Sequence, residues 1–342
     1  MIAATTGVNS APGPHIDAAL VDAAERYLAD LVLRSPCEYS PALSDRLRRR
    51  IWLKWELMQP TRSFKVRGAL NKMRHLAETN DGPLRVATAS TGNHGLALSY
   101  AARIHGAIPV VFAPPGANPA KMQAIREMGG EIRTVGTDWQ TAYAVALSAS
   151  AEEGMSYVHS FDDPYIIAGQ ATVGTEIAAQ VPDVAAVLVP IGGGGLISGV
   201  ATGLRLRGSA AQVIGVQPDG ADSMGQSLAA GKPIMIPPYT TVADGLGSRQ
   251  PGDLTFAITQ ALVREVVAVP DTATVDAMRW VLSAERFLVE PSSAITVAAL
   301  ADPGLDLPDG DVVCVMSGGN VDPALLAAVL GEHRPPTPSG KE

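Results

Sequence analysis

The sequence predicts an α/β protein with parallel sheets and helices on both faces. Short apolar runs typical of strands alternate along the chain with segments of helical length, and this alternation is the pattern of parallel sheets covered by helices. The chain has 342 residues, 46% of them hydrophobic, with 34 glycines and 26 prolines, so two domains, a large core and many turns are expected. In such sheets ligands bind beside the carboxyl ends of strands, which makes the strand-end loops the expected place for a functional site.

The predicted elements follow in order from the hydrophobic periodicity. A helix is expected over 16–31, Pro36 and Pro41 break the segment after it, and 51–56 has the pattern of a strand. The further predicted strands are 86–89, 110–113, 132–135, 157–159, 184–191, 213–217, 266–269 and 312–316. The helices predicted between them include 66–78, 96–105, 120–128, 139–152, 196–207 and 274–285. Residues 1–15 and a polar, Pro-rich tail over 331–342 are expected to be disordered.

Composition excludes several classes of function. The net charge is −8 and no block of Lys and Arg occurs, which argues against a nucleic-acid partner. Cys37 and Cys314 are far apart, so neither a disulfide framework nor a cysteine metal site is expected, and the location expected is the cytoplasm. We expect no signal peptide, because the N-terminus has no basic flank before an apolar core, and no membrane segment, because no apolar run is long enough to cross a bilayer.

The segment 60–69 (PTRSFKVRGA) contains the most informative single residue, Lys65. It lies at the start of a predicted helix, where Thr61 and Ser63 offer hydroxyls for helix capping. A desolvated lysine can lose its proton and form a Schiff base with a carbonyl compound. A solvated helix lysine is the alternative, and Lys65 alone does not decide between the two.

Four loops at predicted strand ends could hold a ligand. Residues 90–95 (STGNHG) offer backbone N–H groups at a helix N-terminus, which is an anion site. The four glycines of 192–195 weaken an ordinary turn but allow a phosphate to approach the backbone closely. Ser317 offers a hydroxyl, and 241–247 is again rich in glycine. Each loop alone could be a capped turn, and neither a dinucleotide fingerprint nor a P-loop motif is present.

Together these features match the chemical groups of pyridoxal phosphate: an aldehyde, a phosphate and a ring nitrogen. The sequence resembles the fold-type-II pyridoxal-phosphate enzymes, most closely the threonine/serine dehydratase and serine racemase family. The motifs occur in family order over residues 16–330: SFKVRGA (63–69), STGNHG (90–95), FDDPYIIAGQAT (161–172), GGGGL (192–196), VADGLG (242–247), VEPSSA (289–294) and SGGN (317–320). The resemblance implies a tryptophan synthase β-like fold of two doubly wound α/β domains with open, mostly parallel sheets. The large cofactor-binding domain would comprise 1–72 and 163–342, and the small mobile domain 73–162.

The resemblance also assigns roles to matching positions. Lys65 would carry the cofactor as a Schiff base and move the α-proton, and Thr91 is the second candidate catalytic residue. The implied cofactor-binding residues are Phe64, Lys65, Asn93, Gly192, Gly193, Gly194, Gly195, Gly245 and Ser317. The implied substrate-binding residues are Ser90, Thr91, Gly92 and His94, with Trp139 added because its segment contacts the β-substituent in relatives. Trp139 and Tyr143 share a helix face if Asp138 caps that helix, and packing within the small domain is the alternative role of both rings.

The expected function is a pyridoxal-phosphate-dependent lyase that converts a β-hydroxy amino acid, L-threonine, L-serine or a close analogue, to a 2-keto acid and ammonia. A hydroxyl at Ser317, rather than a carboxylate, leaves the ring nitrogen closer to neutral and favours loss of a β leaving group. Thr91 replaces the serine that racemases use, and no arginine stands near Thr141 to hold an acidic substrate side chain. Gln217 and Ser223 replace the acidic residues of cation-binding relatives, so no metal is expected.

Three hypotheses about function stay open. Beside the dehydratase, the chain could be an amino-acid racemase or a specialised β-elimination or replacement enzyme of the hydroxyaspartate or hydroxyectoine-pathway type. It could also be a binding protein that kept the scaffold, although the lysine and the glycine loop are intact. The expected partners are a small amino-acid substrate and a second copy of the chain in a homodimer.

Overall fold

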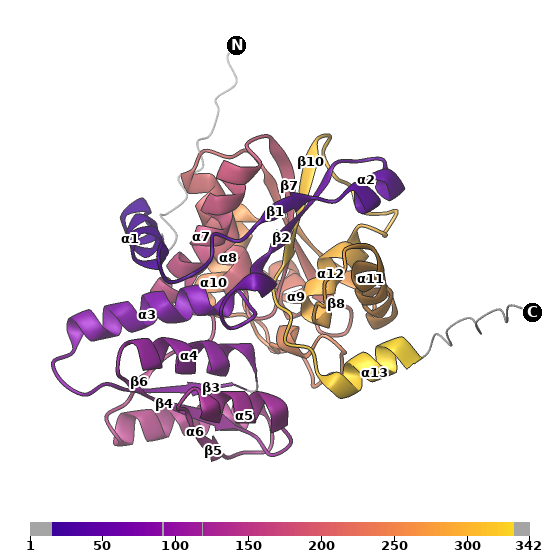
Figure 1. The fold of residues 1–342 in the computed structure, drawn as a ribbon. Coiled ribbons are helices and arrows are strands. Elements are labelled where there is room, and N and C mark those ends of the chain that lie inside the picture. Colours follow the sequence, from indigo (N-terminus) through magenta and orange to yellow (C-terminus); the bar gives the residue numbers. More distant parts are fainter. Residues whose placement is uncertain (1–15, 91, 118, 332–342) are drawn as a thin grey trace, which may run out of the picture.

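The computed structural model describes residues 16–90, 92–117 and 119–331 and contains two β-sheets flanked by helices (Figure 1). The six-stranded sheet has the strand order β1 (Cys37–Tyr39), β2 (Ile51–Trp55), β10 (Asp311–Met316), β7 (Val184–Pro190), β8 (Gln212–Pro218), β9 (Glu265–Val269). The four-stranded sheet has the order β5 (Glu131–Thr134), β4 (Ile108–Ala113), β3 (Arg85–Ala89), β6 (Ser156–Tyr157). Every pairing is parallel except that of β1 with β2. The two open, mostly parallel sheets agree with the predicted fold class.

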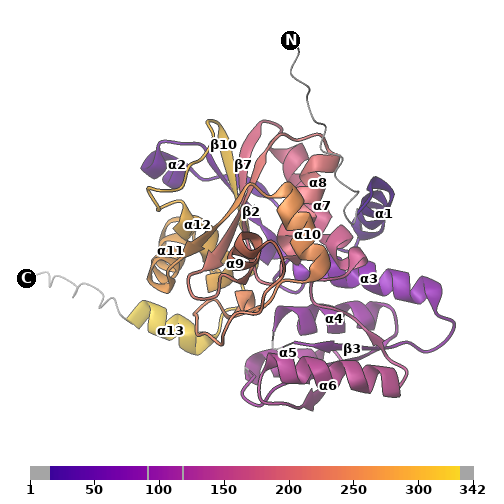
Figure 2. The ribbon, with the colours of Figure 1, turned by 180° about the vertical axis from the view of Figure 1, so that it is seen from behind.

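Helices cover both faces of each sheet, as Figures 1 and 2 show from opposite sides. One face of the six-stranded sheet packs against α7 (Pro164–Gln180), α8 (Gly195–Leu206), α9 (Ser223–Ala230) and α10 (Asp253–Leu262). The other face packs against α2 (Pro41–Leu47), α11 (Asp271–Ala284), α12 (Pro291–Ala299) and α13 (Pro323–Gly331). In the four-stranded sheet, α4 (Asn93–Ile104) and α5 (Pro119–Glu127) lie on one face and α6 (Trp139–Glu152) on the other. Helix α3 (Lys65–Thr79) packs against α7 on one side and α4 on the other, so it lies between the two sheets, and α1 (Ala18–Leu28) packs against α7 and α3.

The four-stranded sheet is formed by one continuous part of the chain. Its strands β3 to β6 follow one another between β2 and β7, whereas the six-stranded sheet draws its strands from both sides of that insertion. The carboxyl ends of β3, β7 and β10 therefore come from distant parts of the sequence, and the loops that follow them carry the predicted site residues.

Two predictions about where elements begin and end are wrong. Pro41 was expected to break the chain, but α2 begins there, because proline is well suited to the first helical position and the Ser40 hydroxyl accepts from the N–H of Leu43 at 3.1 Å. Gly331 was placed in the disordered tail, but it is the last residue of α13. The remaining predicted disordered residues, 1–15 and 332–342, lie outside the described residues.

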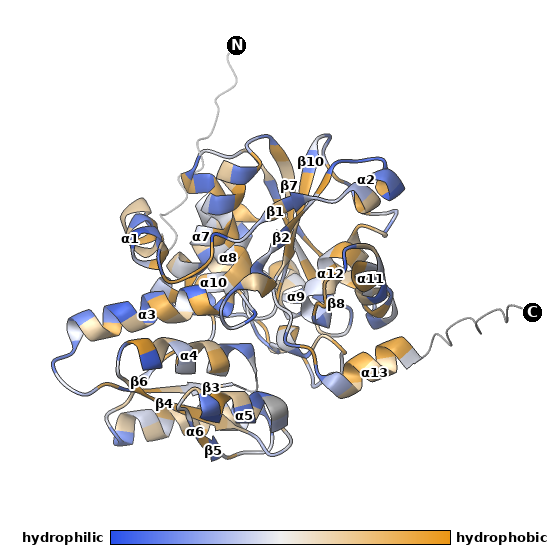
Figure 3. Ribbon diagram, in the orientation of Figure 1, coloured by the Kyte–Doolittle hydropathy of each residue, from blue (hydrophilic) through white to orange (hydrophobic). Residues whose placement is uncertain are grey.

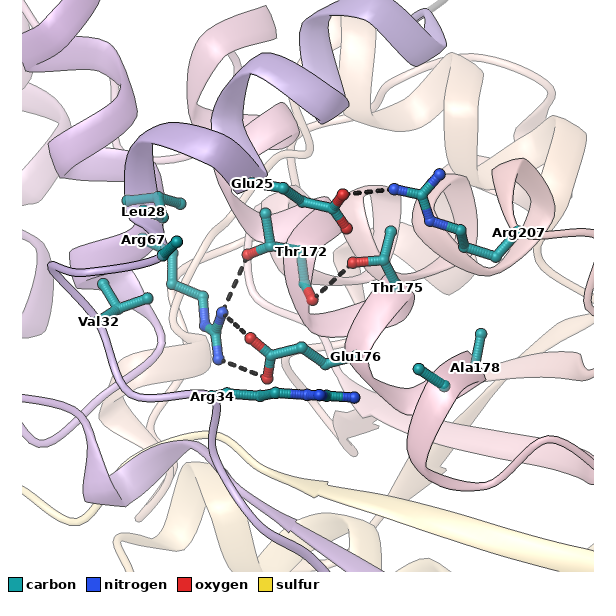
Figure 4. A pocket seen from close by; sticks show the side chains of 12 residues that line it. Glu25, Leu28, Val32, Arg34, Arg67, Thr172, Thr175, Glu176, Ala178 and Arg207 are labelled. Carbon is teal, nitrogen blue, oxygen red and sulfur yellow. Dashed lines mark hydrogen bonds and ion pairs between the residues drawn. The ribbon is translucent and has the colours of Figure 1, made fainter.

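A buried ionic network fixes the start of α3. The guanidinium of Arg67 is fully buried and pairs with Glu56 at 2.8 Å and Glu176 at 2.7 Å, and Lys54 pairs with Glu176 at 2.5 Å. Figure 4 shows Arg67 reaching Thr172 and Glu176 at the wall of a cavity between α1, α3 and α7. Removing one partner of such a network leaves an uncompensated buried charge, which costs about 3–5 kcal/mol. Because Arg67 follows Lys65 by two positions, the network also holds the first turn of α3 in place.

Apolar residues concentrate in the strands and on the helix faces turned toward them (Figure 3). Among the described residues, no helix combines the length and the apolar character needed to cross a bilayer.

Candidate active site

One cavity at the strand ends collects most of the predicted site residues. Its walls include Phe64, Lys65, Ser90, Gly92, Asn93, His94, Trp139, Gly192, Gly193, Gly194, Gly195, Gly245 and Ser317. These residues come from both sheets, since the loops after β3, β7 and β10 and the start of α3 converge there. Thr91 lies outside the described residues. All the other predicted site residues line this cavity.

Lys65 is the first residue of α3 and points its amine into the cavity. Its Nζ donates to the carbonyl of Ser160 at 2.9 Å and lies 5.2 Å from the centre of the Phe64 ring. Burial lowers the pKa of Lys65 to about 8, against the opposing effect of the Glu290 carboxylate. A lysine with such a pKa has a substantial neutral fraction at physiological pH, and a neutral amine can act as nucleophile or base.

The predicted capping of this helix is wrong. The N-cap of α3 is Phe64, which makes no side-chain capping bond. The hydroxyls of Thr61 and Ser63 are buried and have no hydrogen-bond partner among the described residues. The segment is held by backbone bonds instead: the N–H of Phe64 donates to the carbonyl of Ser317 at 3.0 Å.

The glycine loop 192–195 forms a cradle at the N-terminus of α8. Gly194 has φ of 100° and is the N-cap, a conformation that favours glycine. A Cβ on Gly193 would overlap the Phe161 ring, and one on Gly194 would come within 2.8 Å of Met224. The hydroxyl of Thr255 donates to the carbonyl of Gly193 at 2.7 Å and holds the loop. The first N–H groups of a helix lack intrahelical partners, so this arrangement suits a phosphate.

The loop 90–95 begins α4 and is organised by Ser90. The Ser90 hydroxyl oxygen accepts from the N–H groups of Gly92 at 3.2 Å and Gly95 at 3.0 Å. His94 is buried, and its Nε2 donates to the carbonyl of Val158 at 3.3 Å. Burial, with the positive charge of Lys65, lowers the pKa of His94 to about 3. His94 is therefore neutral at physiological pH and presents no positive charge to an anion.

Asn93 connects the two sheets across the cavity. Its Nδ2 donates to both carboxylate oxygens of Glu290, at 2.9 and 3.1 Å, and its Oδ1 accepts from Asn320 at 2.8 Å. Asn93 belongs to α4, whereas Glu290 precedes α12 and Asn320 follows β10. Two residues next to elements of the six-stranded sheet thus fix the Asn93 amide in one orientation.

Ser317 lies at the end of β10, 2% exposed. Its hydroxyl donates to the carbonyl of Ser292 at 3.3 Å and lies 3.3 Å from the Ser293 hydroxyl. The Ser292 hydroxyl also lines the cavity and has no partner among the described residues, and a Cβ on Gly245 would approach it to 2.7 Å. This end of the cavity therefore offers neutral hydroxyls.

Trp139 both lines the cavity and packs within the small domain. Asp138 caps α6, its carboxylate accepting from the N–H of Thr141 at 2.8 Å, so the conditional prediction of a shared helix face is confirmed. The Trp139 ring stacks on Tyr143 with centroids 5.2 Å apart and planes 5° apart, and its Nε1 donates to the carbonyl of Ala89 at 3.2 Å. Trp139 lines the cavity, and both rings also pack against the apolar cluster of this sheet.

These groups fit pyridoxal phosphate. A buried amine of lowered pKa can bond its aldehyde. The glycine loop 192–195, where added Cβ atoms would collide with neighbouring residues, can bind its phosphate. Buried hydroxyls, one of them without a partner among the described residues, can meet its ring.

The family model described as "Pyridoxal-phosphate dependent enzyme" matches residues 28–318 of this chain. The chain belongs to this family. Its cofactor is accordingly pyridoxal 5'-phosphate, as the motifs predicted, and the fold-type-II assignment is confirmed.

The chain is also similar to individual members of the pyridoxal-phosphate dependent enzyme family. It is 39% identical to the L-threonine ammonia-lyase of Geobacter sulfurreducens over 312 residues, 91% of this chain and 77% of the relative. Among solved structures, the processed form of threonine deaminase isoform 2 from Solanum lycopersicum superposes with a TM-score of 0.84 at 32% identity, covering 97% of this chain and 98% of that one. Maize serine racemase superposes with a TM-score of 0.85 at 34% identity, covering 93% and 97%. The chain is thus similar both to lyases and to a racemase of the family.

Gln217 and Ser223, from which no metal site is expected, make internal hydrogen bonds. The Gln217 amide oxygen accepts from the N–H groups of Met224 and Gly225 at 3.0 and 3.1 Å. The Ser223 hydroxyl donates to the carbonyl of Ser248 at 2.7 Å. Within the described ranges no group of three His, Cys, Asp or Glu residues could hold a metal ion.

Sequence reasoning missed several residues of the cavity. Glu290 and Ser292 stand in the VEPSSA motif and Phe161 in the FDDPYIIAGQAT motif, but no role was assigned to them. Lys121 and Asp244, which pair at 3.0 Å, also line the cavity. The motifs marked the first three positions and, through VADGLG (242–247), also Asp244, whereas Lys121 stands in none of them and nothing in the sequence brings Lys121 and Asp244 together.

Proposed function

We propose that this enzyme is a dehydratase/ammonia-lyase of the EC 4.3.1 type, which converts L-threonine, L-serine or a close β-hydroxy analogue to a 2-keto acid and ammonia. The observation that carries this proposal is the buried amine of Lys65 in one cavity with the Gly192–Gly195 cradle and the Ser317 hydroxyl. The identity of 39% to an L-threonine ammonia-lyase supports this choice.

Pyridoxal phosphate, when bound, supplies an electron sink that weakens the Cα–H bond of the amino acid. Lys65, Phe64, Asn93, Gly245 and the Gly192–Gly195 loop would hold it. The neutral amine of Lys65 then accepts the α-proton at Nζ, for which a pKa of about 8 is well matched to neutral pH. The β-hydroxyl leaves as water with one proton, which Lys65 can return from Nζ, and the released enamine is hydrolysed to keto acid and ammonia.

The loop 90–95 would bind the substrate carboxylate. The N-terminus of α4 favours an anion. The Ser90 hydroxyl retains its hydrogen for donation, because its bonds to the N–H groups of Gly92 and Gly95 use only the oxygen as acceptor. The neutral ring of His94 contributes shape rather than charge. Thr91 is proposed as a further contact in the same loop.

The Ser317 hydroxyl would face the ring nitrogen of the cofactor. A neutral hydroxyl does not hold a proton on that nitrogen as a carboxylate would, which favours elimination over a long-lived carbanion. This supports lyase over racemase chemistry.

We further propose that residues 73–162 move as a small domain that closes over the substrate. The ion pair of Lys121 on α5 with Asp244, and the bond from Arg249 to Gln140 on α6 at 3.2 Å, join this part to the loop 236–252. These polar contacts are only partly buried and can break and re-form at small cost.

We also propose that the enzyme works in the cytoplasm as a homodimer. The free thiols of Cys37 and Cys314 support a reducing compartment. Exposed Leu330, which lines an apolar depression between α2, α11, α12 and α13, supports association with a second copy.

The proposal is tested by incubating the holoenzyme with a panel of β-hydroxy amino acids and measuring keto acid, ammonia and the chirality of the remaining substrate. We expect keto acid and ammonia in equal amounts from threonine or serine. Faster accumulation of the D-enantiomer than of keto acid from every substrate would favour the racemase, which the likeness to maize serine racemase makes the second candidate. A bound cofactor with no turnover of any substrate would favour the binding protein.

A further inference from the structure

Lys121 is a second lysine on the wall of the candidate active site. It belongs to α5, where Met122 and Ile125 are buried against the four-stranded sheet. Its side chain is 18% exposed, and its Nζ pairs with Asp244 at 3.0 Å. Among the described residues on this wall, Lys65 and Lys121 are the only lysines or arginines. Since Lys65 would hold the cofactor, Lys121 is the cation to which the reaction as proposed gives no role.

The Lys121 side chain lies along the loop 90–95, which would bind the substrate carboxylate. A Cβ placed on Gly92 would stand 3.5 Å from Cδ and 3.6 Å from Nζ of Lys121. The ammonium therefore lies beside the backbone at the start of α4. The packing of Leu96 from α4 against Met122 and Ile125 fixes α5 in this position.

The loop 90–95 itself offers an anion little positive charge. His94 is neutral, because burial and the nearby charge of Lys65 lower its pKa to about 3. The N–H groups of Gly92 and Gly95 already donate to the Ser90 hydroxyl. The N-terminus of a helix contributes only about half an elementary charge, and a carboxylate that leaves water without a counter-charge is costly to bury. A carboxylate bound at this loop therefore gains from the ammonium of Lys121.

The present partner of Lys121 can be exchanged. Asp244, in the short helix η2 (Asp244–Leu246), has a side chain that is 66% exposed, so its carboxylate can return to water. Ion pairs with an exposed partner contribute little to stability. Arg249, the arginine of the same loop, does not line the cavity and donates to Ile236 and Gln140 instead. No other described arginine or lysine therefore competes with Lys121 for an anion at this place.

We propose that Lys121 binds the carboxylate of the amino-acid substrate beside the loop 90–95 and exchanges Asp244 for it when the substrate enters. The ammonium keeps its proton throughout, and no covalent bond changes. Lys121 would thus recognise the group that all 2-amino acids share, whereas discrimination between side chains is left to other walls of the cavity. This role rests on the proposed function, in which the loop 90–95 holds the substrate carboxylate.

The test compares two ligands that differ in the carboxylate alone. L-Alanine carries it, L-alaninol has a hydroxymethyl group in its place, and neither has a β leaving group. Their dissociation constants are measured from the change in the visible absorbance of the holoenzyme. In Lys121→Met the constant for L-alanine should rise about tenfold, because a charge-assisted hydrogen bond is lost, and the constant for L-alaninol should not change. Lys121→Arg should restore binding, and exposed Lys232→Met should leave both constants unchanged.

Asp244→Asn distinguishes carboxylate binding from a purely structural contact. This change removes the competing carboxylate, so L-alanine should bind about threefold more tightly and L-alaninol as before. If the ion pair only fastened α5 to the loop 236–252, Lys121→Met and Asp244→Asn would change the binding of both ligands in the same direction. The opposite signs expected for L-alanine exclude that explanation.

The proposal is overturned if Lys121→Met leaves the binding of L-alanine unchanged or weakens both ligands equally, or if Asp244→Asn weakens L-alanine. If Lys121→Met does not fold, Asp244→Asn decides by the same signs. Equal affinities of the wild type for the two ligands would refute a carboxylate site at the loop 90–95 altogether. Because L-alanine cannot undergo elimination, a failure to turn over threonine and serine would refute the lyase and leave the result on Lys121 standing.

Discussion

The ring of Phe161 lies against Gly193, so closely that a Cβ on this glycine would overlap the ring edge at Cε1. Phe161 follows the four-stranded sheet, and Gly193 precedes α8 in the other part of the molecule. The cradle can therefore keep its shape only while this position carries no side chain.

Gly193→Ala should weaken cofactor binding. The added methyl group must displace either the ring or the loop, and the N–H groups then lose their alignment toward the phosphate. We expect at least a tenfold rise in the dissociation constant of pyridoxal phosphate, about 1.4 kcal/mol, measured by titration of the absorbance of the bound cofactor. Gly225→Ala is the control: it lies in α9 with the nearest atom 3.8 Å from the added Cβ, and should leave binding unchanged.

Lys65→Ala should abolish turnover without unfolding the protein. The side chain has one hydrogen bond, to Ser160, so its loss leaves few groups unpaired. Borohydride reduction followed by peptide mapping should find the cofactor attached at Lys65 in the wild type and nowhere in the variant. Exposed Lys232→Ala should retain the adduct, and an adduct on any other lysine would refute the site.

Trp139→Ala should change the ranking of substrates. If the ring forms the wall beside the β-substituent, its loss should alter the ratio of kcat/KM for threonine and serine by about tenfold. Trp139→Phe keeps a ring for stacking on Tyr143 but loses the bond to Ala89, and should have a smaller effect. A lowered Tm with the ranking unchanged across serine, threonine and bulkier analogues would mean that the ring only packs this sheet.

Arg62→Gly should stabilise the protein. Arg62 has φ of 58° in the loop before Lys65, a conformation that costs a non-glycine residue about 1 kcal/mol. Its carbonyl accepts from the N–H of Gly319 at 2.9 Å, a bond that glycine retains. Denaturant unfolding should show a gain of up to about 1 kcal/mol, whereas Arg46→Gly in helix α2 should lose about 1 kcal/mol. A lower free energy of unfolding in Arg62→Gly would show that the Arg62 side chain stabilises the protein by more than its backbone strain costs.

Removal of divalent cations should not abolish activity. The Gln217 oxygen is already bonded to two backbone N–H groups and the Ser223 hydroxyl to Ser248, so neither is free to act as a ligand without loss of these bonds. We expect keto-acid formation to persist after treatment with a chelator. Complete loss, restored by magnesium, would contradict this prediction.

The sequence predicted the fold class and the chemistry because both depend on local patterns. Alternating apolar strands and helices indicate a parallel sheet, and the glycine loop, the lysine segment and the SGGN motif each carry their own chemical signature. The fold class also predicts that these segments come together, since the strand-end loops of a parallel sheet meet at one edge.

Only the tertiary structure decided how the groups act on one another. Whether Lys65 has a low pKa depends on its burial and on the opposing effect of the Glu290 carboxylate, which stands 225 positions later in the chain. The hydroxyls of Thr61 and Ser63, which have no partner among the described residues, arise in the same way, because backbone bonds to the loop after β10 rather than helix capping fix this segment. Desolvation and long-range electrostatics depend on groups that are close in space but distant in sequence, so local sequence patterns do not predict them.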